Sequence, residues 1–187
     1  MEIEFENIMI TNGAKQAIYN LFQVLLNDGD EVIIPSPYWL SYPALVRLAG
    51  GKPVILETSA ENGFQIEKEN LISKITSKTK FIIINSPNNP TGKVLREEEL
   101  NVIAEVLREY RNINLISDEI YELILKKGHR HISFASLYKD LTDRIYTVNG
   151  FAKGWAMTGW RLGYLAGKKE VIKASSTLQS QSTSNVC

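Results

Sequence analysis

The chain has 187 residues, and its 21 lysines and arginines balance its 21 aspartates and glutamates, so the formal net charge is zero. It has no basic stripe typical of nucleic-acid binding, no acidic tail, and no apolar stretch near the ~18 residues of a membrane-spanning helix. The single cysteine, Cys187, excludes an intrachain disulfide framework and a cysteine-rich zinc site, and we expect a cytoplasmic protein with one large domain.

Short apolar runs and helical patterns alternate along the chain. The first run, at 7–11, predicts a strand, and a helix with one apolar face follows from Ala14 to Leu25, with Asn12 as its possible N-cap. Six further runs predict strands at 31–35, 52–57, 80–85, 113–117, 144–149 and 161–167. Helical patterns fall at 42–50, 67–75 and 100–107 and after Lys168. This alternation predicts an α/β domain with a mostly parallel sheet.

Polar and unusual residues follow five of the predicted strands. The five segments read NGAK, SPYW, SPNNPTG, DEIY and GFAK. In open α/β sheets, ligands bind outside the carboxyl ends of the strands. We therefore expect the five segments to meet at one edge of the sheet and to build one site.

Two parts of the chain carry groups that suit an anion. Gly13, Ala14 and Lys15 lie at a predicted helix start, where free N–H groups and the helix dipole favour negative charge. Arg161, in the glycine-bounded run TGWRLG, is a second candidate. Taken singly, the helix start is better explained by an ordinary helix cap, and an ordinary surface arginine explains Arg161 equally well.

Three other segments carry groups that suit a flat aromatic ligand. Trp39 could stack on a ring, and Asn89, held between an asparagine and a proline, could donate a hydrogen bond. Asp118, at a strand end, would need a positive partner if buried, and a protonated ring nitrogen would serve. Tyr121 could lie near it across a helical turn. Core packing of the tryptophan and plain turn chemistry in the proline-rich loop are the alternatives.

Lys153 follows the predicted strand at 144–149, in the segment GFAKG. Its small and apolar neighbours would desolvate the amine, and desolvation lowers the pKa of a lysine and makes the neutral, nucleophilic form accessible. A solvated loop lysine is the alternative. Together the segments offer an anion cradle, an aromatic platform, a carboxylate, hydrogen-bond donors and a nucleophilic amine. Pyridoxal 5′-phosphate (PLP) requires these groups.

The motifs TNGAKQA, PSPYWLSYP, NSPNNPTG, SDEIY and NGFAKGWAMTGWRLGY resemble, in order and spacing, the class I aminotransferases of PLP fold type I, in the aspartate aminotransferase branch. The resemblance runs through nearly the whole chain. It implies a three-layer α/β/α fold with a mostly parallel mixed sheet, and a homodimer when the protein is full length. It also implies PLP-dependent transfer of an amino group from an L-amino acid, aspartate first, to a 2-oxo acid such as 2-oxoglutarate, through a lysine Schiff base.

The resemblance implies a role for each candidate residue. Lys153 would bind the cofactor covalently and then move the proton at the substrate Cα. Asp118 would pair with the pyridine nitrogen, and Asn89 and Tyr121 would hydrogen-bond the ring oxygen. Lys153, Asp118 and Tyr121 are thus the implied catalytic residues, and Trp39 would stack on the ring. The implied phosphate-binding positions are Gly13, Ala14, Lys15 and Arg161.

Two departures from the family pattern bear on the site. Many relatives carry a serine three residues before the lysine, where this chain has Gly150, which leaves one phosphate hydrogen bond without its usual donor. Full members are also about twice as long, so the resemblance assigns residues 1–187 to the PLP-binding large domain, without the N-terminal segment and the small C-terminal domain. In the family, that C-terminal part carries the arginine that grips the substrate α-carboxylate.

Three other functions remain open. The glycine spacing of GWAMTG resembles a nucleotide-binding P-loop, but Trp160 stands where the lysine should be. A non-catalytic PLP-binding module, or another PLP reaction such as decarboxylation or β-elimination, would use the same motifs.

His129 and His131 lie in a polar segment without cysteines or paired carboxylates close by, so we expect a solvated loop and no metal there. We also expect Glu119 to be solvated.

Overall fold

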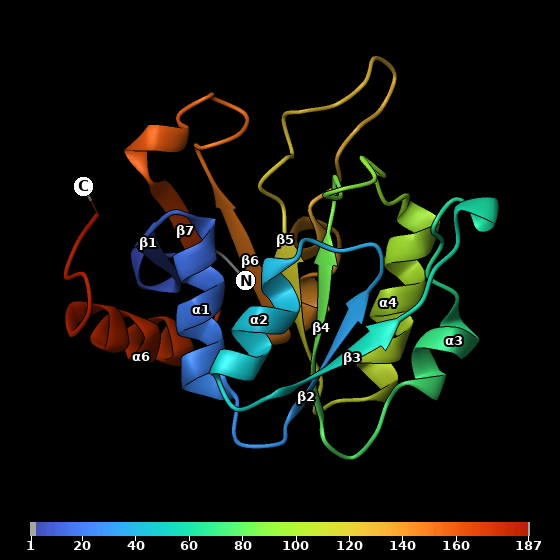
Figure 1. Ribbon diagram of the computed structural model, residues 1–187, viewed down its shortest axis with the longest axis horizontal. Coiled ribbons are helices and arrows are strands. Elements are labelled where there is room, and N and C mark those ends of the chain that lie inside the picture. Colours follow the sequence, from blue (N-terminus) through green and yellow to red (C-terminus); the bar gives the residue numbers. More distant parts are fainter. Residues whose placement is uncertain (1–2, 187) are drawn as a thin grey trace.

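The computed structural model describes residues 3–186, so Cys187, on which the disulfide expectation rests, lies outside the described residues. In this part of the chain seven strands form one sheet, in the order β1-β7-β6-β5-β4-β2-β3 (Figure 1). The strands are β1 (Ile8–Asn12), β2 (Glu31–Pro35), β3 (Lys52–Leu56), β4 (Thr79–Asn85), β5 (Asn114–Asp118), β6 (Ile145–Gly150) and β7 (Leu162–Ala166). The helices are α1 (Ala14–Leu25), α2 (Ser41–Leu48), α3 (Lys68–Ser73), α4 (Glu97–Glu109), α5 (Phe134–Leu137) and α6 (Lys169–Ser180).

Strand direction decides where the loops gather. The five neighbours β3, β2, β4, β5 and β6 are parallel, whereas β7 is antiparallel both to β6 and to β1. Two reversals leave β1 running in the same direction as the parallel strands. The carboxyl ends of β1, β2, β4, β5 and β6 and the amino end of β7 therefore share one edge, the upper edge in Figure 1.

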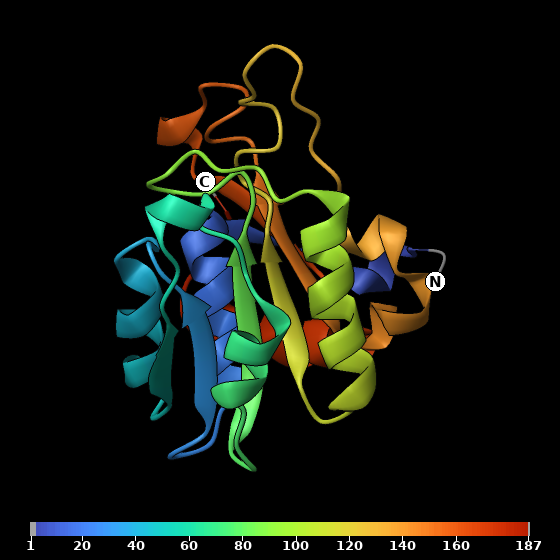
Figure 2. The same ribbon diagram turned by 90° about the vertical axis from the view of Figure 1, so that its right-hand side faces the viewer.

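Helices cover both faces of the sheet, which gives three layers (Figures 1 and 2). The alternation of side chains along β4 shows why: Phe81 and Ile83 pack in a core with α1, α2 and α6, whereas Ile82 and Ile84 pack in a second core with α3, α4 and α5. A strand that is apolar on both sides is typical of a parallel sheet covered on both faces. The expected three-layer α/β/α fold with a mostly parallel mixed sheet is confirmed.

Most element positions agree with the sequence analysis, and the differences lie at helix ends. Asn12 was expected to cap α1, but the N-cap is Gly13, at φ 79°. The backbone N–H of Asn12 donates to the Gln16 side chain instead, at 2.6 Å. Helix α3 is shorter than the pattern at 67–75, and the four-residue α5 was not expected because one turn has no periodicity to detect. Across residues 3–186, every helix is too short or too polar to cross a membrane.

Candidate active site

A cavity of about 300 Å³ opens at the carboxyl edge of the sheet. Every site residue named from the sequence lines it: Gly13, Ala14, Lys15, Trp39, Asn89, Asp118, Tyr121, Lys153 and Arg161. The cavity also has lining residues that the sequence analysis did not name: Tyr42, Asn85, Ile120, Ala152 and Thr158. The five strand-end segments therefore meet at one site, as the expected sheet topology requires.

One end of the cavity is cationic. The first amides of α1, those of Ala14 and Lys15, have no helical acceptor, and the helix dipole points its positive end at the cavity. The Arg161 guanidinium lies against this helix start, where a Cβ on Gly13 would stand 2.3 Å from Nη2. Glycine at position 13 is thus what lets an arginine and a helix N-terminus converge. The amine of Lys15 lies 5.0 Å from the centre of the Trp39 ring.

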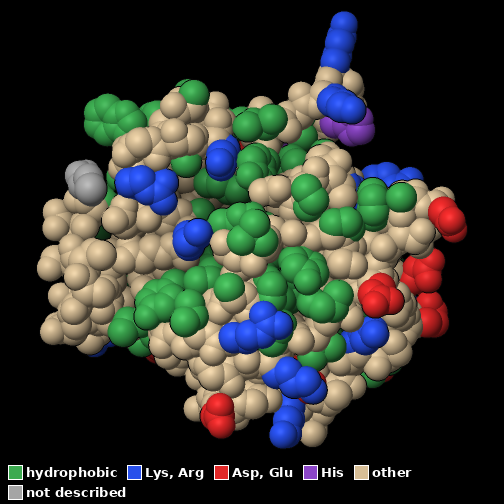
Figure 3. Space-filling model, viewed as in Figure 1, with side chains coloured by type: hydrophobic (Ala, Val, Ile, Leu, Met, Phe, Trp, Pro, Cys, Tyr) green, Lys and Arg blue, Asp and Glu red, His purple; other side chains and the backbone are tan. Residues whose placement is uncertain are grey.

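The surface around this end is poor in negative charge. On the face shown in Figure 3, Lys and Arg side chains lie among hydrophobic ones over the upper left and centre, above and around α1 in the view of Figure 1. Most acidic side chains visible on this face lie toward the right edge instead. An anionic ligand would therefore approach the cavity without strong repulsion.

Asp118 lies at the other side of the cavity, at the end of β5, and is only 3% exposed. Its Oδ2 accepts a hydrogen bond from the Tyr42 hydroxyl at 2.6 Å, and its Oδ1 accepts one from the Ile120 amide at 3.2 Å. Burial raises the pKa of Asp118 to about 6, although both hydrogen bonds oppose the rise. None of the ion pairs within residues 3–186 involves Asp118. The carboxylate is therefore buried without a cation.

A chain of amides connects the proline-rich loop to Asp118 and Tyr121. The Asn89 backbone amide donates to Oδ1 of Asn85 at 2.7 Å, and the Asn85 side chain donates to the Asp118 carbonyl oxygen at 3.0 Å. The Asn89 side chain in turn donates to the Tyr121 hydroxyl at 3.3 Å. Burial, together with the charge of Asp118, raises the pKa of Tyr121. The loop thus holds an amide donor and a phenol side by side.

Lys153 lies above this pair, with its amine 5.8 Å from the centre of the Tyr121 ring. From the sequence, we expect small and apolar neighbours to bury this amine. That expectation is wrong for the chain described, because the Lys153 side chain is exposed. The reason is that Lys153 follows β6 into a loop that rises above the sheet edge rather than into the core (Figure 1).

Glu119 and His131 also correct the sequence analysis. Glu119 is 3% exposed rather than solvated, because side chains alternate along a strand and it points away from Asp118. Its carboxylate accepts hydrogen bonds from Ser117, Ser133 and the Phe134 amide, at 2.8, 3.1 and 3.3 Å. His131 approaches the same carboxylate, at 3.2 Å, and its side chain is 9% exposed.

Only His129, of the two histidines, lies in an exposed loop. The paired carboxylates that the sequence analysis found missing near His131 are Glu119 and Glu122, whose oxygens lie within 4.8 Å of each other and of the histidine. Glu119 already has hydrogen-bond donors on both oxygens. We therefore interpret its contacts as structural: they hold the segment at 131–134 against the end of β5.

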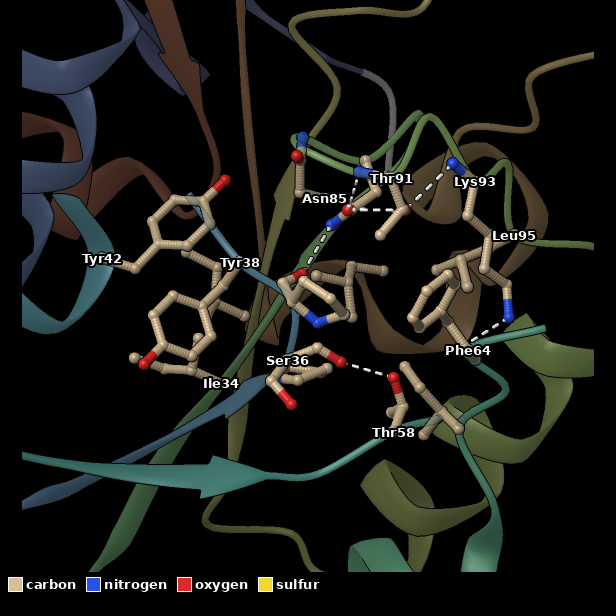
Figure 4. Close-up of a pocket in the computed structure, with 16 residues that line it drawn as sticks. Ile34, Ser36, Tyr38, Tyr42, Thr58, Phe64, Asn85, Thr91, Lys93 and Leu95 are labelled. Atoms are coloured by element: carbon tan, nitrogen blue, oxygen red, sulfur yellow. Dashed lines mark hydrogen bonds between the residues drawn. The ribbon is translucent and has the colours of Figure 1, made fainter. Parts of the chain in front are cut away.

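Of the three polar lining residues that sequence reasoning missed, Tyr42 and Asn85 bond to Asp118, whereas the Thr158 carbonyl accepts a hydrogen bond from Arg161. Tyr42 comes three residues after Trp39 at the start of a helix, and its ring packs edge-to-face on Trp39, with 5.4 Å between centroids. That spacing was the available signal, since residues three apart on a helix are neighbours. A smaller cavity, of about 40 Å³, shares both residues with the site and holds little more than one water molecule (Figure 4).

The comparisons with known proteins identify the family of the chain. The family model "Aminotransferase class I and II" matches residues 1–187. The chain is 52% identical to a probable aspartate/prephenate aminotransferase of Rickettsia bellii, covering 100% of this chain and 47% of the relative. It is 51% identical to an aspartate aminotransferase of Bacillus subtilis, covering 99% of this chain and 47% of the relative.

Solved structures show the same likeness. Aspartate aminotransferase from Thermus thermophilus with maleate superimposes with a TM-score of 0.91 and 49% identity, over 97% of this chain and 46% of that one. The enzyme from Rhizobium meliloti superimposes with a TM-score of 0.95 and 41% identity, over 100% and 46%. The chain spans about half the length of these relatives. On its sequence and its fold, the chain belongs to the class I and II aminotransferase family.

Proposed function

We propose that this chain is the PLP-binding large domain of an aminotransferase that moves an amino group from L-aspartate to a 2-oxo acid such as 2-oxoglutarate. The observation that carries the proposal is the convergence of a cationic helix start, a buried carboxylate and a lysine on one cavity. The names of the Rickettsia bellii and Bacillus subtilis relatives both include aspartate, which supports the choice of amino donor.

The residues present fit PLP group by group. The amides at the start of α1, with Arg161, suit a phosphate. The buried carboxylate of Asp118, which has no cation among its neighbours, suits a protonated pyridine nitrogen. The paired donors Asn89 and Tyr121 suit the ring oxygen. The cavity volume of about 300 Å³ is at the lower end of the range of ligand sites, ~300–1,000 Å³.

When bound, PLP supplies an electron sink for the pair released as the substrate Cα–H bond breaks. The residues of this chain do the rest. Lys153 would take the proton from the substrate Cα and deliver it to the cofactor carbon that is joined to the amino nitrogen. Asp118, as the ionised acceptor, holds a proton on the ring nitrogen. Trp39 orients the ring and excludes water from one of its faces.

A chemical test places the cofactor on a single lysine. PLP is added to the purified chain, the complex is reduced with borohydride, and the peptides are mapped by mass spectrometry. We expect the pyridoxyl group on Lys153 and expect Lys153→Ala to abolish it. An adduct on Lys15, the other lysine that lines the cavity, would contradict the assignment of Lys153.

The proposal extends to the assembly and to its location. We propose that the full-length enzyme is a cytoplasmic homodimer that takes small amino-acid and 2-oxo-acid substrates and binds neither nucleic acid nor membrane. Large apolar side chains support the dimer, since Phe5, Trp155 and Trp160 are 90%, 62% and 63% exposed. Light scattering on the full-length protein would measure its mass in solution, and a monomer at micromolar concentration would contradict the dimer.

A further inference from the structure

Tyr42 lies where the core meets the candidate site. It is the second residue of α2 and is 2% exposed. Its ring packs on Trp39 and lines both the site and the smaller cavity of Figure 4. The hydroxyl, its only polar side-chain atom, donates to Oδ2 of Asp118 at 2.6 Å. Because the ring is held by close packing, the hydroxyl has little freedom to leave the carboxylate.

The proton of this hydrogen bond stays on Tyr42. Burial, and then the charge of Asp118, raise the pKa of Tyr42 well above its ordinary value. The tyrosine therefore keeps its proton at neutral pH, where it remains a donor. A tyrosine that only donates to Asp118 leaves the carboxylate ionised, so that Asp118 can accept a further hydrogen bond from a ligand.

The hydrogen bond acts on Asp118 in two ways. Tyr42 on Oδ2 and the Ile120 amide on Oδ1 bind different oxygens, so together they fix the plane of the carboxylate. A donor also favours the ionised form. Burial, the larger effect, and the nearby charge of Glu119 act in the opposite sense and raise the pKa of Asp118. Of the two groups that lower the pKa, Tyr42 has the larger effect.

We propose that Tyr42 is a positioning residue for the transamination proposed above: it holds the Asp118 carboxylate oriented and ionised, so that Asp118 can keep a ring nitrogen protonated. Tyr42 acts through Asp118. The inference rests on the proposed function, but its first consequence concerns the chain without cofactor. The other titratable groups around Asp118 are Glu119, whose charge acts on it although its side chain points away, and Tyr121; Lys15, Lys153 and Arg161 line the same cavity without an ion pair to Asp118.

The first experiment measures Asp118 in the cofactor-free chain, by pH titration of ¹³C-labelled aspartate carboxyls in NMR spectra. In Tyr42→Phe we expect the pKa of Asp118 to rise by about 1–2 pH units, since a hydrogen bond to a charged group has been lost. Tyr38→Phe is the matched control, because Tyr38 lines the smaller cavity of Figure 4 and has no bond to Asp118. It should leave the titration unchanged.

An Asp118 titration that is the same in Tyr42→Phe and in the wild type would overturn the proposal. Should Tyr42→Phe not fold, the wild type still gives an answer through the hydroxyl proton of Tyr42. A buried donor at 2.6 Å should give a slowly exchanging downfield proton resonance that shifts over the pH range in which Asp118 titrates. A hydroxyl resonance that is indifferent to that titration would overturn the proposal as well.

The second experiment is a double-mutant cycle on PLP affinity, with wild type, Tyr42→Phe, Asp118→Asn and the double variant. If Tyr42 acts through Asp118, Tyr42→Phe should weaken PLP binding by roughly tenfold in the wild-type background and by less than about twofold in the Asp118→Asn background. The ¹⁵N resonance of labelled PLP should also move toward the unprotonated position in Tyr42→Phe. A purely structural role would not produce that shift.

The outcomes separate this proposal from the function on which it rests. Equal losses of affinity in both backgrounds, with an unchanged ¹⁵N resonance, would mean that Tyr42 only fills space, and would overturn its positioning role while leaving PLP binding intact. A wild-type chain that binds no PLP at Lys153 would instead overturn the proposed function, and the positioning role with it.

Discussion

The burial of the Asp118 carboxyl lowers the stability of the folded chain at neutral pH, although the proposed function needs this group buried and ionised. Its pKa is about 6 in the folded chain against an ordinary value of 3.8, mainly because of burial. Between these two values the folded state binds the proton more tightly than the unfolded state does. The free energy of unfolding therefore falls as the pH rises from about 4 through 6. A difference of about two pH units corresponds to about 3 kcal/mol at neutral pH.

Asp118→Asn should remove this penalty in the cofactor-free chain. We expect the free energy of unfolding to rise by up to about 3 kcal/mol at pH 7.5 and by less than about 1 kcal/mol at pH 4, where the carboxyl is largely protonated. Urea denaturation at the two pH values measures both. Asp28→Asn, at an exposed position, is the control and should change neither value. A loss of stability at pH 7.5 would show that the bonds of Tyr42 and Ile120 outweigh burial.

Gly13 is a residue whose missing side chain matters. A Cβ there would meet the Arg161 guanidinium at 2.3 Å, and the backbone has φ +79°. We expect Gly13→Ala to displace Arg161 and to weaken PLP binding by at least tenfold, besides costing about 1 kcal/mol of stability from backbone strain. Absorbance titration with PLP measures the affinity.

Gly63→Ala is the matched control for this substitution. Gly63 has a similar positive φ, +66°, but an added Cβ would meet nothing within 4 Å. Gly63 is left-handed helical (ψ 31°), whereas Gly13 (ψ 161°) lies in a region almost confined to glycine, so Gly63→Ala should lose less stability than Gly13→Ala, and no PLP affinity. If the two variants bind PLP equally well, the contact between Gly13 and Arg161 has no part in the anion site.

The sequence predicts site residues that follow strand ends and misses those that depend on side-chain partners. Lys153 and Asp118 could be named because each follows an apolar run within a few residues. Tyr42 could not, since its partner lies 76 residues away and only the packing of α2 on the sheet brings the two together. Glu119 was wrongly expected to be solvated for the same reason: its donors from Ser133 and Phe134 come from a later segment.

At the scale of elements, α4 shows how one side chain completes a helix. Helix α4 ends at Glu109, and its last carbonyl oxygens have no helical donors. The Arg144 guanidinium, from the segment before β6, donates to the carbonyl oxygens of Leu107, Tyr110 and Ile113 at 2.7, 3.3 and 2.9 Å. It thereby joins the end of α4 to the start of β5 and places a positive charge at the negative end of the helix.

Arg144→Met should keep most of the packing of the side chain and lose these three bonds. We expect a loss of about 2–3 kcal/mol in the free energy of unfolding, because charged hydrogen bonds to partly buried carbonyls are removed. Thermal or urea denaturation measures it. Arg111→Met is the control, because Arg111 is exposed. Burial lowers the pKa of Arg144, and the nearby positive charge of Arg111 lowers it further. Its removal should leave stability unchanged or raise it slightly, and an equal loss in both variants would contradict the capping role.

Periodicity predicts the long elements well because burial on two faces leaves a strong pattern. The apolar run of β4 and the one-sided face of α1 both came out within a residue or two of their bounds. Helix starts were predicted less well. Asn12 is a favoured capping residue by type, yet the chain needs a positive φ next to Arg161, and this requirement places Gly13 at the cap. Tertiary contacts overrode the local preference.

At the scale of the whole molecule, several large apolar side chains are exposed. A cavity of about 490 Å³ lies beside β1 and β7, lined in part by Ile8, Ile10, Phe151 and Tyr164. Ile10 is 49% exposed, and Leu40 and Trp155 are 78% and 62% exposed. Such surface favours association with another chain or segment. We therefore expect the 187 residues alone to associate or to be partly disordered in solution.

Catalysis is expected to need more than these 187 residues. Arg161 is the one arginine among the described residues that line the cavity, and the proposed phosphate site uses it, which leaves no arginine there for the substrate α-carboxylate. Transamination requires the Cα–H bond to be aligned with the ring, and a small misplacement costs much of the rate. We expect little or no turnover of aspartate with 2-oxoglutarate at saturating PLP, measured in a coupled assay beside the full-length Bacillus subtilis relative. Turnover within about tenfold of that enzyme, or about 1.4 kcal/mol of barrier, would show that the cavity already holds the substrate correctly.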